Sequence, residues 1–441
     1  MIKLSDHFTY GKLLRFVLPS IAMMIFTSIY GVVDGYYVSN YAGKTPFAAV
    51  NLIYPVLMIL GTVGFMFGTG GSALVAKTMG EQDKEKANSI FSMLITVSVV
   101  ISVILSILGI VFLRPIAVAL GAEGALLHNA VLYGRIILVA LPGFVLQLEF
   151  QSFMIAAEKP KLGLVITLVS GLTNMLLDAI LVGVIKAGLV GAAIATAVSQ
   201  IIGGLIPFFY FLRPNNSTLR LTKFKFDSRA IWKTCTNGSS EFMNNIAMSL
   251  VSMLYNAQLM KYEGENGIAA YGVLMYVGMV FSAAFIGYSI GSAPIVSFNY
   301  GAQNHKELHS LLKKSAVLIA FFAAGMVTAA LSLSGVLSSF FVGYDRELAA
   351  LTQRAFWLYS FAFIPMGFAM FASGFFTALN DGLTSAILSF LRTLVFQVSA
   401  VFLLPLIMGI DGIWFSVFVA ELLALIVSVV FLAVKRKRFG Y

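Results

Sequence analysis

The chain has 441 residues, of which 59% are hydrophobic and only 11% are charged. A soluble domain averages about 25% charged residues, so this composition excludes a soluble protein and indicates an integral membrane protein. The single cysteine, Cys235, excludes an intrachain disulfide and a cysteine metal cluster. The net charge of +10 is concentrated in short loops, which favours membrane orientation over nucleic-acid binding.

Long apolar runs separated by polar punctuation predict twelve transmembrane helices. About 20 apolar residues span the hydrocarbon core of a bilayer, and each run reaches that length. The expected fold class is therefore all-α integral membrane. The expected spans are residues 13–39, 51–76, 88–113, 131–157, 162–185, 189–212, 234–260, 268–298, 315–341, 355–379, 383–407 and 412–434.

The distribution of lysine and arginine predicts which side of the membrane each loop faces. With the N-terminus inside, the inside segments carry 20 of these residues and the outside segments carry 6. Cytoplasmic loops are rich in positive residues, so we expect a multi-pass protein of the plasma (inner) membrane with both termini in the cytoplasm.

An internal repeat divides the chain at its longest basic linker. GLVGAAIATAVSQ (188–200) aligns with GIDGIWFSVFVAE (409–421), and two further segments align at nearly the same offset of 221 residues. Each half has six helices, so both halves enter the membrane in the same direction and form two six-helix bundles about a pseudo-twofold axis along the membrane normal. The expected domains are an N-lobe (1–212) with the cation site, a basic cytoplasmic linker (213–233) and a C-lobe (234–441).

Carboxylates inside the predicted spans are the first candidates for function. An ionisable group there costs about 2.5–3.5 kcal/mol on insertion scales and is functional by default. At about 1.5 Å per residue, Asp34 lies roughly 15 Å below Lys44, and Asp178 lies roughly 12 Å below Lys186. Both acids are therefore expected at one level in the outer half of the membrane. The alternative is that they are buried acids held by neighbouring hydroxyls.

Neutral oxygens are expected at the level of these two acids. Asn174 and Tyr30 precede Asp178 and Asp34 by four residues, so each shares the helix face of its acid, and Thr196 reaches the same depth. Two carboxylates with amide and hydroxyl oxygens suit Na⁺, and a close carboxylate pair can hold a proton. These five residues form the expected cation-coupling site. Asp34, Asn174, Asp178 and Thr196 are the expected ligands if Na⁺ is the coupling ion.

Five further residues are candidates for substrate binding. Glu149 and Glu241 each lie about nine residues from a cytoplasmic loop end. They either line a cytoplasm-facing vestibule or are satisfied structural acids. Phe150, Met154 and Met175 are candidates for an adaptable aromatic and thioether wall, with ordinary helix packing as the alternative.

Three more residues in the predicted spans are unusual. Pro19 removes a backbone hydrogen bond within the first helix and is interpreted as a conformational hinge, with a fixed packing kink as the alternative. Arg392 is expected to pair with an acid or a carbonyl. Glu421 in the last helix has no evident partner in the sequence.

Together these features resemble the multidrug and toxic compound extrusion (MATE) family over essentially the whole chain. The segments that carry the resemblance are LPSIAMMIFTSIYGVVDGYYV (18–38), GTGGSALVAKTMGEQD (68–83), TNMLLDAI (173–180) and GLVGAAIATAVSQ (188–200). The resemblance implies a secondary transporter that exchanges H⁺ or Na⁺ for organic cations and amphiphilic drugs by alternating access. It also implies that Asp34, Asn174, Asp178 and Thr196 occupy the N-lobe cation positions, with Tyr30 adjoining and Pro19 bending the first helix.

One departure from the family concerns the C-lobe. Some members place a second cation site there, with a Glu on helix 7 and an Asp on helix 10. Glu241 resembles the first, but helix 10, WLYSFAFIPMGFAMFASGFFTAL (357–379), has no acid. A complete C-lobe site is therefore not expected.

Two other functions remain as alternatives. A lipid or lipid-linked sugar flippase of related two-lobe architecture needs Arg or Lys in its cavity for pyrophosphate, whereas this chain offers mostly acids. An intramembrane aspartyl protease would use Asp34 and Asp178, but their flanks lack the expected pattern and the repeat has no role there. We expect no cofactor beyond the transported ion. The expected partners are small organic cations and the lipid bilayer, with no nucleic acid, and the expected state is a monomer.

Overall fold

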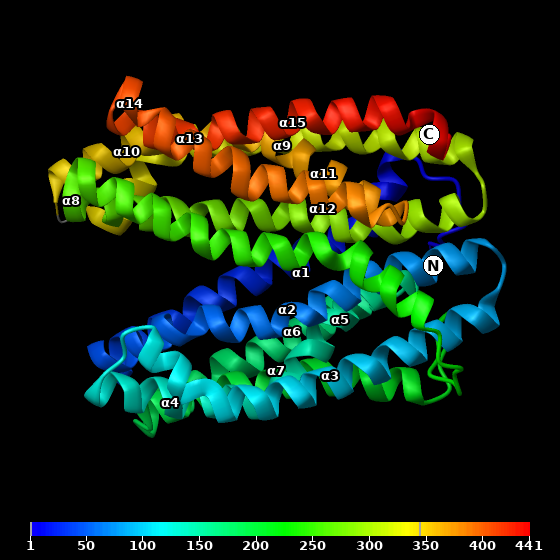
Figure 1. The fold of residues 1–441 in the computed structure, drawn as a ribbon, viewed down its shortest axis with the longest axis horizontal. Helices are drawn as coiled ribbons and strands as arrows, with labels where there is room; N and C mark the ends of the chain where they lie inside the picture. Colours follow the sequence, from blue (N-terminus) through cyan, green and yellow to red (C-terminus); the bar gives the residue numbers. More distant parts are fainter. Residues whose placement is uncertain (1, 344) are drawn as a thin grey trace.

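The computed structural model describes residues 2–343 and 345–441, and its helices form two stacked bundles (Figure 1). The first bundle, called the N-lobe, contains the first seven α-helices. Its elements are α1 (Tyr10–Tyr37), η1 (Val38–Ala42), α2 (Lys44–Gly80), α3 (Lys84–Ala119), α4 (Gly124–Val139), α5 (Leu141–Ala156), α6 (Pro160–Leu177), η2 (Asp178–Val184) and α7 (Gly188–Leu212).

The second bundle, called the C-lobe, begins after a stretch without helix that ends at Asp227. Its elements are α8 (Ser228–Gly301), α9 (His305–Val342), α10 (Arg346–Ser360), α11 (Phe363–Ala378), α12 (Gly382–Phe390), η3 (Leu391–Phe396), α13 (Gln397–Leu403), α14 (Pro405–Met408) and α15 (Ile410–Phe439). The residue boundaries predicted for the two lobes and their linker stay a prediction.

The predicted seventh and eighth spans join in α8, which has non-helical backbone angles at Gly264, with φ of 61°. Nine helices in the described residues are long and apolar enough to cross a membrane, and two bent pairs bring the number to eleven. The span missing from that number is the first part of α8. It carries several asparagines and a glutamine among its apolar residues, which lowers its hydropathy.

Two spans that we expected to be continuous are broken, so that part of the prediction is wrong. The fourth span bends by 57° between α4 and α5, and the tenth bends by 49° between α10 and α11. Pro142 and Pro365 lie just after these breaks. Because proline cannot donate the helical hydrogen bond and clashes with the preceding turn, each break has a local cause.

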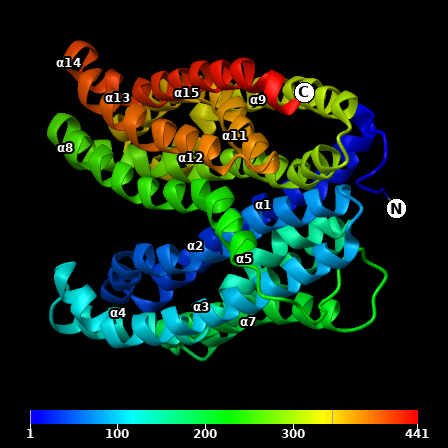
Figure 2. The same ribbon diagram turned by 45° about the vertical axis from the view of Figure 1, so that its right-hand side comes forward.

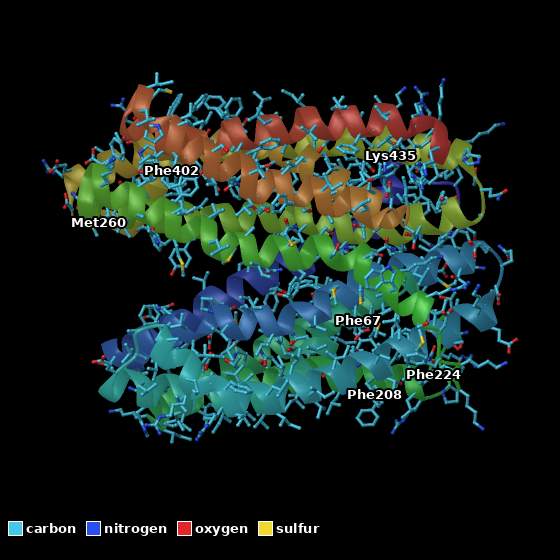
Figure 3. All side chains as sticks on the ribbon, viewed as in Figure 1. Phe67, Phe208, Phe224, Met260, Phe402 and Lys435 are labelled. Atoms are coloured by element: carbon cyan, nitrogen blue, oxygen red, sulfur yellow. The ribbon has the colours of Figure 1, made fainter. Side chains whose placement is uncertain are left out.

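The two lobes meet at one end of the molecule, called here the closed end, and diverge toward the other (Figures 1 and 2). At the closed end α2 packs directly on α8. A Cβ atom at Gly238 would lie 2.0 Å from Met66 O, and one at Gly301 would lie 2.0 Å from Lys77 O. Only glycine permits such an approach of two backbones. Lys435 and Phe224 lie at this end, whereas Met260 and Phe402 lie at the other (Figure 3).

The N-terminal segment joins the two lobes at the closed end. The Leu4 amide donates to Glu158 Oε1 of the N-lobe at 2.7 Å. The Phe8 amide donates to Glu307 Oε1 on α9 at 2.9 Å, and His7 Nδ1 lies 2.7 Å from Glu307 Oε2. The side chains of Leu4 and Phe8 are fully buried. Residues 2–9 therefore act as a strap between the N-lobe loop and α9.

Candidate functional site

Two carboxylates from different helices meet inside the N-lobe. Asp34 lies in the last turn of α1, and Asp178 is the first residue of the π-helical stretch η2. The two carboxyl groups are close enough to interact electrostatically. Asp178 is fully buried, and neither of its carboxylate oxygens has a hydrogen-bond partner within residues 2–343 and 345–441. π-Helical stretches are rare and occur often at functional sites.

Thr196 and Asn174 complete the group around these acids. Thr196 Oγ on α7 donates to Asp34 Oδ1 at 3.4 Å and accepts from Asn174 Nδ2 at 3.4 Å. Asn174 is 1% exposed, and its Oδ1 has no partner among the described residues. The structure therefore brings together the four residues that we expected as cation ligands, and it leaves oxygens free that can bind a cation.

Tyrosines and a glutamine adjoin the acid pair. Tyr30 lies one turn before Asp34 on α1, and its hydroxyl lies close to Gln147 on α5. The buried Tyr133 on α4 lies near Asp34 and Thr196. The sequence analysis did not identify Tyr133 or Gln147. Tyrosine is frequent in this chain, with 17 residues, so neither residue type nor spacing distinguished this one.

Glu149 lies apart from the acid pair. It is fully buried on α5 and accepts a hydrogen bond from Ser98 Oγ on α3 at 2.5 Å. Its other oxygen has no partner in the described part of the chain. In this conformation Glu149 lines no open vestibule.

The three apolar candidates for substrate binding divide into two groups. Phe150 and Met154 are each 1% exposed and line a small cavity between α5, α6 and α7, together with Gln147 and Gln151. Phe150 also stacks on Phe211, with ring centroids 5.6 Å apart. Met175 is half-buried on α6 outside this cavity. The cavity is far smaller than the roughly 300–1,000 Å³ of a typical ligand pocket.

The C-lobe contains a charged cluster of a different kind. Arg392 in η3 donates from Nε to both carboxylate oxygens of Glu421 on α15, at 2.8 and 3.1 Å. The prediction that Arg392 pairs with an acid is confirmed. The sequence shows no partner for Glu421, because the two residues are 29 positions apart and meet only in the packed fold. Glu241 on α8 lies near Arg392.

Pro19 occupies the inner part of α1, fifteen residues before Asp34. The next two residues touch the C-lobe: a Cβ atom at Gly287 of α8 would lie 2.6 Å from Ile21 Cα and 2.8 Å from Ser20 O. Pro19 therefore stands where α1 packs on the opposite lobe.

Comparison with known proteins identifies the architecture. A sequence model of the MatE family matches residues 19–180 and 242–403, which together exceed half of the chain. The chain belongs to the MATE family. The two matched segments lie 223 residues apart, close to the expected repeat offset of 221.

Relatives and solved structures agree with this assignment. Multidrug export protein MepA of Staphylococcus haemolyticus (strain JCSC1435) is 25% identical, over 93% of this chain and 90% of its own. MepA of Staphylococcus saprophyticus is 23% identical, over 97% and 94%. A structure described as the outward-facing conformation of a multidrug resistance MATE family transporter of the MOP superfamily has a TM-score of 0.93 at 21% identity, covering 98% of this chain and 97% of its own.

A further solved structure with the same fold is described as having a different kind of binding pocket. It is a MOP superfamily transporter from Pyrococcus furiosus, described as having a binding pocket of reverse polarity, with a TM-score of 0.92 at 20% identity over 99% and 98% of the two chains.

The predicted two-lobe, twelve-helix MATE fold is confirmed for this chain. As a member of a transporter family it is a multi-pass membrane protein and not an enzyme, which removes the protease alternative.

Proposed function

We propose that this protein exports organic cations and amphiphilic drugs in exchange for H⁺ or Na⁺, by alternating access. The observation that carries the proposal is the pair formed by the half-buried Asp34 and the fully buried Asp178, which has no lysine or arginine partner among the described ion pairs. Two ionised carboxylates that lie close together repel each other strongly where the surroundings screen charge weakly. A proton or a cation removes that repulsion, so the pair is suited to bind a mobile positive charge.

The chemistry of the surrounding atoms is compatible with either coupling ion. Na⁺ would be coordinated by oxygens of Asp34, Asp178, Asn174 and Thr196, and hard cations prefer such ligands. A proton would be shared between the two carboxylates, since two close acids cannot both ionise readily. In either case the transported ion is cargo and not a resident cofactor.

Exchange follows from competition for the same negative charge. An organic cation is attracted by the ionised acids, and ion loading removes that attraction. Linkage requires the drug to weaken ion binding by the factor by which the ion weakens drug binding, typically about 5- to 150-fold. Because Pro19 stands beside the contact of α1 with α8, bending at Pro19 would transmit the loading of Asp34 to the lobe interface. Phe150, Met154 and Met175 would join the drug site only after the N-lobe rearranges.

The distribution of positive charge supports the orientation of the protein in the membrane, and the names of its relatives support drugs as its cargo. The excess of lysine and arginine on the segments at the closed end supports a cytoplasmic location for that end. Relatives are named multidrug export proteins, which favours drugs over the lipid-linked sugars of the flippase alternative.

Equilibrium binding of tetraphenylphosphonium, a fixed organic cation, tests the proposal. Binding to the purified protein is measured from pH 5 to 8, with and without Na⁺, for wild type and Asp34→Asn. We expect affinity to fall as protons or Na⁺ load the site, and the variant to lose that dependence. Affinity that is independent of both ions in the wild type would overturn the proposal.

A further inference from the structure

The centre of the C-lobe holds an ion pair within the membrane-spanning helices. Arg392 and Glu421 have side chains that are 10% and 0% exposed, and one guanidinium nitrogen bonds both carboxylate oxygens. The other described ion pairs lie at the ends of helices or in loops, as with Lys435 and Asp381 at 2.6 Å. Arg392 is therefore the basic side chain that the fold carries to the interior.

A second acid lies near the guanidinium, on α8, which packs against η3. Glu241 projects from α8 and is close enough to Arg392 to feel its positive charge. Tyr359 from α10 lies near both Arg392 and Glu421. The C-lobe centre thus consists of two carboxylates from α8 and α15 and one guanidinium from η3.

The two lobes differ in how their acid pairs are neutralised. The N-lobe centre has two carboxylates, Asp34 and Asp178, with only hydroxyls and amides around them. The C-lobe centre also has two carboxylates, but the covalently attached cation Arg392 is hydrogen-bonded to Glu421 and lies near Glu241. A buried carboxylate requires a positive charge or a proton nearby. In the N-lobe that charge must come from solution, and in the C-lobe it belongs to the chain.

We propose that Arg392 is a tethered cation that takes the place of a mobile one in the C-lobe and thereby restricts cation loading to the N-lobe. The guanidinium compensates Glu421 directly and repels any second cation from Glu241. The role of this restriction in transport rests on the proposed exchange mechanism, whereas the binding property itself does not. A purely structural role for the ion pair predicts lost stability without Arg392, but no new binding site.

This assignment is tested with variants made in a parent protein whose N-lobe cation site has been inactivated, called the silenced parent. Asp34→Asn with Asp178→Asn gives a parent protein in which the proposed N-lobe site has lost its charge. Arg392→Met with Glu421→Gln then replaces the ion pair by neutral side chains of similar length. Replacing both partners of a buried pair is tolerated far better than removing one. Glu241 is left without a compensating cation.

The measurement is equilibrium binding of ²²Na⁺ and of radiolabelled tetraphenylphosphonium to purified protein at pH 8. We expect no saturable binding by the silenced parent, and about one equivalent of cation per protein after Arg392→Met with Glu421→Gln. Adding Glu241→Gln should remove that binding. Arg392→Lys, which keeps the charge, should resemble the parent. Single Arg392→Gln serves as an independent variant and should also gain one equivalent.

Two results would overturn the inference. One is saturable cation binding by the silenced parent that Glu241→Gln removes, because the C-lobe would then load a cation despite Arg392. The other is an Arg392 variant that gains no cation binding although its elution profile matches that of the parent. The proposed exchange function fails separately, through wild-type binding that does not respond to Asp34→Asn, so the two failures are distinguishable.

Discussion

Removal of the Thr196 hydroxyl is the sharpest test of the N-lobe geometry. Thr196→Val keeps the shape of the side chain but removes the donor to Asp34 Oδ1 and the acceptor of Asn174 Nδ2, both at 3.4 Å. Hydrogen bonds to charged groups contribute about 1.5–3 kcal/mol. At 3.4 Å the contact exceeds the usual 2.5–3.0 Å of O–H···O bonds, so we take about 1 kcal/mol. Since about 1.4 kcal/mol corresponds to tenfold, Na⁺ affinity should fall about fivefold. Proton affinity should instead rise, because the hydroxyl stabilises the ionised form of Asp34 over the protonated form.

The assay is drug efflux from proteoliposomes as a function of the imposed H⁺ or Na⁺ gradient, which gives the half-saturating ion concentration. Thr173→Val is the matched control, because the exposed Thr173 hydroxyl donates to Val169 O of its own helix at 2.7 Å. For Thr196→Val we expect the half-saturating Na⁺ concentration to rise about fivefold and the half-saturating H⁺ concentration to fall, with no change in either for Thr173→Val. An unchanged value for Thr196→Val would show that this hydroxyl does not belong to the ion site.

Three further predictions concern the closed end. Gly301→Ala should lower the free energy of unfolding by about 1–3 kcal/mol through overpacking, seen as a lower melting temperature, whereas Gly325→Ala, with nothing within 4 Å, should not. Glu307→Gln should accelerate hydrogen exchange of residues 2–9, and unchanged exchange would show that the strap does not depend on this charge. Burial alone would raise the pKa of Asp381, but hydrogen bonds from Lys435 and Thr384 lower it overall. That stabilisation is present above the unfolded pKa near 3.8 and is lost as pH falls through the lower folded pKa, so Asp381→Asn should lower the melting temperature at pH 7, and this effect should shrink as pH falls below 3.8.

The sequence predicts the positions of the spans well, because an apolar run of 20 or more residues has few stable alternatives in a membrane. It also predicts the level of Asp34 and Asp178, since depth follows from counting residues along helices with fixed rise. The bends near Pro142 and Pro365 had a local signal, but proline in a membrane helix is compatible with a continuous span, so the signal was not decisive.

Other features depend on packing between distant helices. The π-helical stretches η1, η2 and η3 have no marker residue that separates them from ordinary helix. The Arg392–Glu421 pair needs the rotation of η3 and α15 about their axes, which hydropathy does not fix. Tyr133 and Gln147 reach the acid site only because the bent pair α4 and α5 packs against α2 and α7.

The two lobes show how a repeated scaffold can acquire unequal centres. The π-helical stretches η2 and η3 lie in the corresponding fifth and eleventh spans. The first residue of η2 is Asp178, and η3 contains Arg392. The repeat offset of 221 pairs Asp178 with Ser399 and Arg392 with Gly171, so the charges of the two centres come from different positions of the repeated span. A mobile cation can load only where the chain itself supplies no positive charge. On that physical ground the proposed role of Arg392 would make ion loading a property of one lobe, even though both lobes carry two acids within their spans.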